Sequence, residues 1–195
     1  MADPYDAVLL AGGTARRLGG VDKPGLLVGG STLLDRVLAA VGGATQVVVV
    51  GPRRTTNASV LWCHENPPGG GPVAALAAGL QSVTAGRVVV LAADLPFVTE
   101  AVVSRLLEAA EGRDGALAVD DDGRDQLLLG AWSTAALRNA MPARPAGARL
   151  GAVVAGLDAI RVSLPTEPGE PLPWLDCDTA EDLAVMRGIA GTGQE

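Results

Sequence analysis

Continuous apolar runs alternate along the chain with segments in which apolar positions recur every three or four residues. Short runs of Val, Leu and Ala between polar or glycine-rich turns are typical of strands buried on both faces of a sheet. Such strands are predicted over 7–10, 46–50, 59–63, 88–93, 115–119, 126–132 and 160–164. Because strand and helix patterns alternate, we predict an α/β fold with three Rossmann-like layers around a mainly parallel sheet.

Capping residues delimit the predicted helices. A Ser, Thr or Asp side chain at the start of a helix accepts a hydrogen bond from a free backbone N–H, and glycine commonly follows the end. These signals predict helices from Ser31 or Thr32 to Val41, from Pro72 to Leu80, from Glu100 (capped by Thr99) to Glu111, from Ser133 onward, from Leu150 to Leu157, and after Asp178 or Thr179.

Composition narrows the classes of protein. At 195 residues the chain suits one domain, 1–195, and we expect 191–195 to be a loose tail. The formal net charge of −7 argues against sequence-independent binding of nucleic acid, which needs a basic face. No apolar run reaches the roughly 18 residues of a membrane span, and 1–6 lacks the apolar core of a signal peptide. Cys63 and Cys177 lack metal-ligand spacing, so a reducing cytoplasm is the expected setting.

The stretch from Leu10 to Lys23 is glycine-rich and cationic, and it follows the first predicted strand. Gly12 and Gly13 let a ligand approach the backbone closely, and free N–H groups in such a loop can cradle phosphate oxygens. Arg17 and Lys23, the only lysine in the chain, add positive charge. The loop matches neither the P-loop pattern G-x-x-x-x-G-K-[ST] nor the dinucleotide pattern G-x-G-x-x-G. We predict a phosphate-binding loop of another kind; a surface loop with incidental charge is the alternative.

Three later segments carry candidate chemistry. The Pro- and Gly-rich loop 64–72 opens a helix at Pro72, so N–H groups and the positive end of the helix dipole suit a nucleotide there, with a linker as the alternative. Asp94 follows a central strand, where open α/β sheets bind ligands, and its carboxylate suits Mg²⁺, although it could instead cap a turn. Asp176 and Asp178, two residues apart, can project to the same side of an extended segment.

Two charged turns are less informative. Arg53 and Arg54 follow the second strand, where ligand contact and a solvated turn are equally good interpretations. The acidic segment 120–125 lacks the spacing and the closing Glu of an EF-hand calcium loop, so we predict a solvated turn between two strands.

Taken together, these segments resemble the motifs of the molybdenum cofactor guanylyltransferases. Residues 10–23 are similar to the signature L-A-G-G-x-x-x-R-x-G-x-D-K with one extra residue, and the loop 64–72 with its helix resembles P-G-x-G-P-L-A-G-L. Asp94-Leu95-Pro96 is similar to the D-x-P motif, and 176–183 resembles N-x-N-T-P-E-[ED]-L. The resemblance covers nearly the whole chain and implies the nucleotide-diphospho-sugar-transferase type of α/β fold.

This resemblance implies transfer of GMP from GTP to the phosphate of molybdopterin, with Mg²⁺ as cofactor and pyrophosphate as product. The implied catalytic residues are Arg17, Lys23 and Asp94. The implied nucleotide-binding residues are Leu10, Ala11, Gly12, Gly13, Lys23, Asn66, Gly71, Pro72 and Asp94. The implied metal ligands are Asp94 and Asp178, and the implied acceptor contacts are Asp176, Asp178 and Arg149. GTP and molybdopterin are the implied partners, with transient contact to other cofactor-biosynthesis proteins or apo-molybdoenzymes.

The choice of base depends on three departures from the family pattern. Asn66 stands where the guanylyl enzymes commonly have Asp, and Asp176 and Asp178 stand where they often have Asn, which is closer to the molybdopterin cytidylyltransferases. The Leu10–Gly13 segment, however, favours the guanylyl enzymes. We therefore predict GTP as the donor. The alternatives are CTP, or a protein that binds GTP without catalysis.

Overall fold

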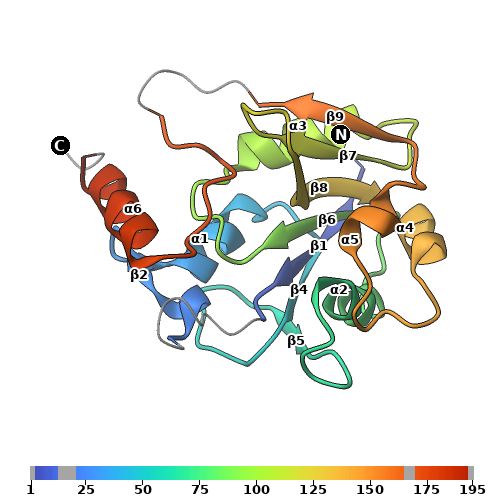
Figure 1. Ribbon diagram of the computed structural model, residues 1–195, viewed down its shortest axis with the longest axis horizontal. Coiled ribbons are helices and arrows are strands. Elements are labelled where there is room, and N and C mark those ends of the chain that lie inside the picture. The colour runs from blue at the N-terminus through green and yellow to red at the C-terminus, as the bar shows by residue number, and fades with distance from the viewer. Residues whose placement is uncertain (1–2, 13–20, 165–169, 193–195) are drawn as a thin grey trace.

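A central sheet with helices on both faces forms the core of the computed structural model, which describes residues 3–12, 21–164 and 170–192 (Figure 1). The described strands are β1 (Tyr5–Leu10), β2 (Leu27–Val28), β3 (Ser31–Thr32), β4 (Gln46–Val50), β5 (Leu61–Cys63), β6 (Arg87–Ala92), β7 (Gly115–Val119), β8 (Asp125–Ser133) and β9 (Ala159–Ser163). The described helices are a 3₁₀ turn, η2 (Lys23–Gly25), and α1 (Leu33–Ala40), α2 (Pro72–Leu80), α3 (Glu100–Ala109), α4 (Thr134–Ala140), α5 (Leu150–Val154) and α6 (Ala180–Thr192).

The main sheet has the strand order β5-β4-β1-β6-β8-β7-β9. Only β8 runs antiparallel to its neighbours within this sheet, so the prediction of a mainly parallel sheet is confirmed. The chain moves from β1 to β4 and β5 on one side and then returns to place β6 on the other side of β1. This reversal creates a switch point at the carboxyl end of β1, where open α/β sheets bind ligands.

The alternating direction of the side chains along β1 explains why helices pack on both faces of the sheet and form three layers. Ala7 and Leu9 pack into one apolar cluster with residues of α1 and α3, whereas Val8 and Leu10 pack into another with residues of α2, α4 and α5. Successive side chains of a strand point to opposite faces, so a strand buried on both sides must be apolar throughout. The continuous apolar runs of the sequence follow from this arrangement.

A third apolar cluster brings the end of the chain to the ligand-binding edge. Phe97, just beyond β6, packs with Cys177 and with Met186 of α6, and both Phe97 and Cys177 are buried. Because Cys177 points into this cluster, its neighbours Asp176 and Asp178 are left at the surface. Helix α6 lies beside β2 at one end of the molecule (Figure 1).

Several predicted boundaries move. We expected a loose tail from Gly191, but Gly191 and Thr192 belong to α6, since no proline interrupts 180–192 and each of its two glycines lowers helix propensity only modestly. Residues 193–195 lie outside the described residues. Helix α3 ends two residues early, before Gly112 at φ 71°, and α5 ends at Val154 rather than Leu157.

The predicted caps agree better. Thr32 Oγ1 accepts from Asp35 N, and Thr99 Oγ1 accepts from Val102 N. Thr179, rather than Asp178, caps α6: Asp182 N donates to Thr179 Oγ1 at 3.1 Å and Thr179 N donates to Asp182 Oδ2 at 2.7 Å. None of the helices in the described part of the chain is both long enough and apolar enough for a membrane span.

Candidate active site

Lys23 lies at the centre of a charged cluster at the carboxyl edge of the sheet. Its Nζ is 2.5 Å from Asp94 Oδ2 and 2.6 Å from Asp178 Oδ1. Lys23 opens the 3₁₀ turn η2, Asp94 follows β6 by two residues, and Asp178 directly precedes the cap of α6. The fold thus brings together three predicted site residues from three distant parts of the sequence.

Negative charge exceeds positive charge among the described members of this cluster. Burial alone would lower the pKa of Lys23, but the Asp94 and Asp178 carboxylates outweigh burial and raise it, so the ammonium stays charged. Partial desolvation, followed by the nearby charges of Asp178 and Asp94, raises the pKa of Asp176 even though this residue is exposed. The three carboxylates share one lysine, which favours the approach of a further cation.

The residues present fit a divalent metal bound together with phosphate. The carboxylates of Asp94 and Asp178 converge on the same cation, the Nζ of Lys23, at distances of 2.5 and 2.6 Å. Within 3–12, 21–164 and 170–192, no group of three or more His, Cys, Asp or Glu side chains is arranged to hold a metal ion. Mg²⁺ commonly uses one or two carboxylates together with substrate phosphates and water, which matches this pair.

Backbone hydrogen bonds position the start of the glycine-rich segment. Ala11 N donates to Val50 O at 2.8 Å, and Ala93 N donates to Leu10 O at 3.0 Å, so the chain leaves β1 between the ends of β4 and β6. A Cβ on Gly51, at φ 145°, would lie 2.6 Å from Ala11 O, so glycine permits this close approach. Gly12 is the next residue after Ala11. The predicted contacts Gly13 and Arg17 fall in 13–20, outside the described residues.

The loop before α2 lies beside a second predicted segment. Gly71, at φ 88°, is the N-cap of α2, and Pro72 occupies the first turn as predicted. Gly147 N donates to Gly70 O at 2.8 Å, which places the segment leading to Arg149 next to this loop. Arg149 is exposed at the start of α5, whereas Asp176 and Asp178 lie on the Lys23 side.

Sequence reasoning placed the partner for the base at Asn66 and overlooked its neighbour Glu65. Asn66 is exposed, and the Asn66–Pro67 peptide bond is cis. Half-buried Glu65 folds over the loop, where its Oε1 accepts a hydrogen bond from Gly69 N at 3.0 Å. Glu65 is therefore the carboxylate of this loop, one residue before the expected position.

An arginine–carboxylate pair next to Lys23 was also missed. Arg54 Nε lies 2.9 and 2.8 Å from the two carboxylate oxygens of Asp22, and its Nη2 lies 2.5 Å from Oδ1. The hydrogen bonds from Arg54 lower the pKa of Asp22. The sequence left two interpretations of the Arg53–Arg54 turn, a ligand contact and a solvated turn. The Arg54 side chain fits neither of them.

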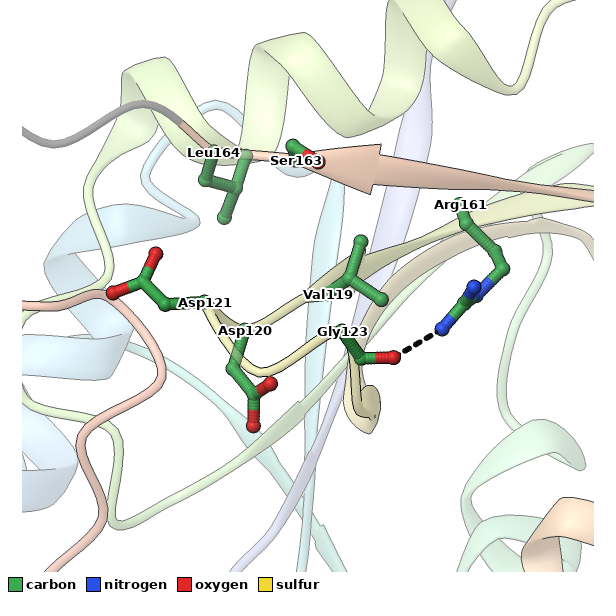
Figure 2. Close-up of a pocket in the computed structure, with 7 residues that line it drawn as sticks. All are labelled: Val119, Asp120, Asp121, Gly123, Arg161, Ser163 and Leu164. Carbon is green, nitrogen blue, oxygen red and sulfur yellow. Dashed lines mark hydrogen bonds between the residues drawn. The ribbon is translucent and has the colours of Figure 1, made fainter.

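A cavity of about 430 Å³ lies farther along the same edge, at the carboxyl ends of β7 and β9 (Figure 2). Its lining residues are Val119, Asp120, Asp121, Gly123, Arg161, Ser163 and Leu164. Arg161 of β9 joins this strand to the turn between β7 and β8, because its guanidinium donates to Gly123 O and, at 2.6 Å, to Asp125 Oδ1. Asp120 holds the turn through Oδ1, which accepts from the backbone N–H groups of Asp122 and Arg124. Residues 121–125 of the acidic turn are exposed, as the prediction of a solvated turn requires, and the turn also borders this cavity.

Comparison with known sequences gives consistent matches over nearly the whole chain. A family model described as the MobA-like NTP transferase domain matches residues 7–189. A protein from Nitrobacter hamburgensis named molybdenum cofactor guanylyltransferase is 32% identical, with 96% of this chain and 95% of the relative covered. A protein of the same name from a Bradyrhizobium species is 33% identical, with 94% and 92% covered.

Solved structures support the fold. Molybdopterin-guanine dinucleotide biosynthesis protein A from Archaeoglobus fulgidus superposes with a TM-score of 0.77 at 23% identity, covering 96% of this chain and 99% of that one. The 2-C-methyl-D-erythritol 4-phosphate cytidylyltransferase from Thermus thermophilus superposes with a TM-score of 0.71 at 24% identity, covering 98% and 100%. The fold is therefore the nucleotidyltransferase fold that the sequence predicted.

Proposed function

The chain belongs to the MobA-like NTP transferase family of nucleotidyltransferases, and on this premise we propose that it transfers GMP from GTP to the phosphate of molybdopterin. An oxygen of the acceptor phosphate attacks the α-phosphorus of GTP. The bond from that phosphorus to the bridging oxygen breaks, and its electron pair leaves with pyrophosphate. The product is a guanine dinucleotide form of the cofactor.

The observation that carries this proposal is the cluster of Lys23, Asp94 and Asp178 at the switch point of the sheet. Phosphoryl-type transfer depends on positioning and on stabilising developing charge more than on a side-chain nucleophile. The ammonium of Lys23 would neutralise charge on the triphosphate. Arg17 is proposed to assist it. Mg²⁺ held by Asp94 and Asp178 would polarise the phosphate oxygens when bound.

For the base, we infer that Glu65 contributes more than Asn66. Guanine presents two donors on one edge, N1–H and the 2-amino group, which a carboxylate can accept side by side. Leu10 O and Gly70 O each already accept one backbone hydrogen bond, as Glu65 Oε1 does, but the carboxylate of Glu65 has a second oxygen with which to accept from the base. Cytosine offers a single donor, its 4-amino group, beside the acceptors N3 and O2, so a carboxylate can accept two adjacent hydrogen bonds from guanine but only one from cytosine. Glu65 therefore supports GTP over CTP as the donor.

For the acceptor, the cavity bordered by Asp120 and Asp121 is the supporting feature. Neighbouring strands lie about 4.8 Å apart, so the ends of β6 and β7, which flank β8, are roughly 10 Å apart along the sheet edge. An elongated acceptor could place its phosphate near Lys23 and its ring system in the cavity. The pterin ring carries N–H donors, which suit the acidic wall. Asp176 and Asp178 would lie beside the acceptor phosphate, and Arg149 is proposed to meet it from the side of the α2 loop.

The direct test is release of pyrophosphate from GTP in the presence of molybdopterin and Mg²⁺. We expect release that requires both substrates and stops when EDTA removes the metal. Tight GTP binding without release would instead identify a binding protein that lacks catalysis, and release from CTP alone would identify a cytidylyltransferase. The cytoplasm as the compartment, supported by two free cysteines, and transient contact with cofactor-biosynthesis proteins or apo-molybdoenzymes remain predictions.

A further inference from the structure

All three guanidinium nitrogens of Arg54 donate hydrogen bonds within the protein. Nε and Nη2 donate to the carboxylate of Asp22, and Nη1 donates to Pro52 O at 2.7 Å. The Arg54 side chain is only 14% exposed, although Asp22 is 56% exposed. A two-pronged arginine–carboxylate contact of this kind fixes orientation as well as distance. With these donors engaged, Arg54 holds the protein rather than a ligand.

Asp22 in turn fixes the turn that presents Lys23. Asp22 is the N-cap of η2, and its carbonyl accepts from Gly25 N at 3.1 Å. A Cβ on Gly25 would lie 2.8 Å from Asp22 Oδ2, so the absence of a side chain at Gly25 leaves room for the Asp22 carboxylate. The next residue is Lys23, whose Nζ reaches Asp94 beyond β6. A continuous set of contacts therefore runs from the end of β4, through η2, to the end of β6.

From this geometry we propose that Arg54 is a positioning residue, which holds Lys23 in place by clamping Asp22. The inference rests on the proposed function in one respect, since it takes Lys23 to be the group that meets the nucleotide phosphates. The clamp also offsets the negative charge of Asp22 close to the place where the triphosphate would lie. The same Asp22 carboxylate, left unpaired, would repel that anion.

Because Lys23 is the only lysine, protein labelled with ¹³C and ¹⁵N lysine gives one lysine side-chain NMR signal. We expect Arg54→Gln to move this signal toward that of a free lysine and to lower kcat/KM for GTP about 10- to 100-fold, the usual cost of removing a residue that orients a ligand-binding side chain. Arg54→Lys should lower kcat/KM for GTP similarly, because lysine keeps the charge and loses the fork. This variant is followed by kinetics alone, because it adds a second lysine signal. Asp22→Asn should reproduce both effects, and the double variant should add little to either single one.

The matched control is Arg113→Gln. Arg113 also pairs with an aspartate, Asp158, through Nη1 at 3.0 Å, but it precedes β7 at the opposite edge of the sheet. This variant should leave the Lys23 signal and the GTP kinetics unchanged. Thermal melting of every variant separates loss of the clamp from loss of the fold, and the exposed position of Asp22 makes Asp22→Asn the safer of the two tests.

An unchanged Lys23 signal in folded Arg54→Gln and Asp22→Asn proteins would overturn the proposal. Strictly additive effects of the two substitutions would also overturn it, since they would show that Arg54 acts by a route other than Asp22. A shifted Lys23 signal with normal GTP kinetics would support the clamp and would contradict the role of Lys23 in the proposed function. The two claims can therefore fail separately.

Discussion

The ammonium nitrogen of Lys23 lies 2.5 Å from Asp94 Oδ2, and this ion pair joins the end of the glycine-rich segment to the carboxyl end of β6. Burial alone would lower the pKa of Lys23, and the carboxylates of Asp94 and Asp178 raise it above the ordinary 10.5. We expect Asp94→Asn to lower the pKa of Lys23, because burial is then less opposed. A pH titration of the single lysine NMR signal measures this directly.

The sign of the linked stability follows from the raised pKa. A lysine whose pKa is higher in the folded than in the unfolded protein stabilises the fold fully below its unfolded value, and this contribution is lost as pH rises through the folded value. The difference in unfolding free energy between the wild type and Asp94→Asn should therefore be constant near neutral pH and diminish above about pH 10.5. A difference that grew with alkalinity would contradict the charge assignment.

Removal of either charged partner should impair the chemistry. Lys23→Ala and Asp94→Ala should each lower the rate of pyrophosphate release by at least about 10²-fold, the scale of losing one preorganised charge contact. Arg105→Ala, which removes an exposed cation from α3, is the control and should keep the wild-type rate. A Lys23→Ala protein with normal turnover would exclude the proposed role of this lysine.

The cavity at the ends of β7 and β9 gives a prediction for the acceptor alone. Asp121→Asn should raise KM for molybdopterin about tenfold, within the range for one hydrogen bond to a charged group, and leave KM for GTP unchanged. Asp122→Asn is the matched control, since Asp122 is in the same turn, pairs with Arg124 at 3.2 Å and does not line the cavity. Equal effects of the two substitutions would mean that turn charge, and not the cavity, is responsible.

Substitution of two helical glycines tests how closely α2 packs on the central sheet. A Cβ on Gly79 of α2 would lie 2.6 Å from Val8 Cγ1 and 2.9 Å from Val50 Cγ2, whereas a Cβ on Gly188 of α6 would meet nothing within 4 Å. Gly79→Ala should lower the unfolding free energy by about 1–3 kcal/mol through overpacking. Gly188→Ala should raise it by about 0.5–1 kcal/mol, because alanine is the better helix former. Urea denaturation of both variants measures these changes in unfolding free energy. Equal changes in the two variants would contradict the close packing of α2 on the sheet.

The sheet was predictable from sequence because its strands are buried on both faces. That burial demands continuous apolar runs, so 46–50 and 115–119 were predicted with their observed bounds. Asp94 was predictable for a related reason, since the end of a central parallel strand is where such a sheet exposes a functional side chain. Helix ends were less predictable, because glycine lowers helix propensity without fixing where a helix stops.

The contacts that refine the site are long-range, and this is why local patterns missed them. Asp22 and Arg54 are 32 residues apart and meet because β1 and β4 are neighbours in the sheet. The cavity joins Asp120 to Arg161, which depends on the pairing of β7 with β9. Glu65 was not singled out for a different reason: the motif pointed to Asn66 as the contact to the base, and only the folded loop shows that the Glu65 side chain turns back over it.

The choice of base is tested by exchanging the carboxylate of Glu65 for an amide. Glu65→Gln keeps the length of the side chain and its hydrogen bond to Gly69 N, but it replaces one acceptor oxygen by a donor. We expect the preference for GTP over CTP to fall about 10- to 100-fold, since a hydrogen bond to a charged group contributes about 1.5–3 kcal/mol. Calorimetric competition among GTP, CTP and ATP in Mg²⁺ measures the preference, with Asn66→Ala as the neighbouring control. If Asn66→Ala abolishes the preference and Glu65→Gln does not, Asn66 is the base-reading residue. A wild-type preference for CTP would overturn the guanylyl assignment itself and leave the fold and the charged cluster around Lys23 unaffected.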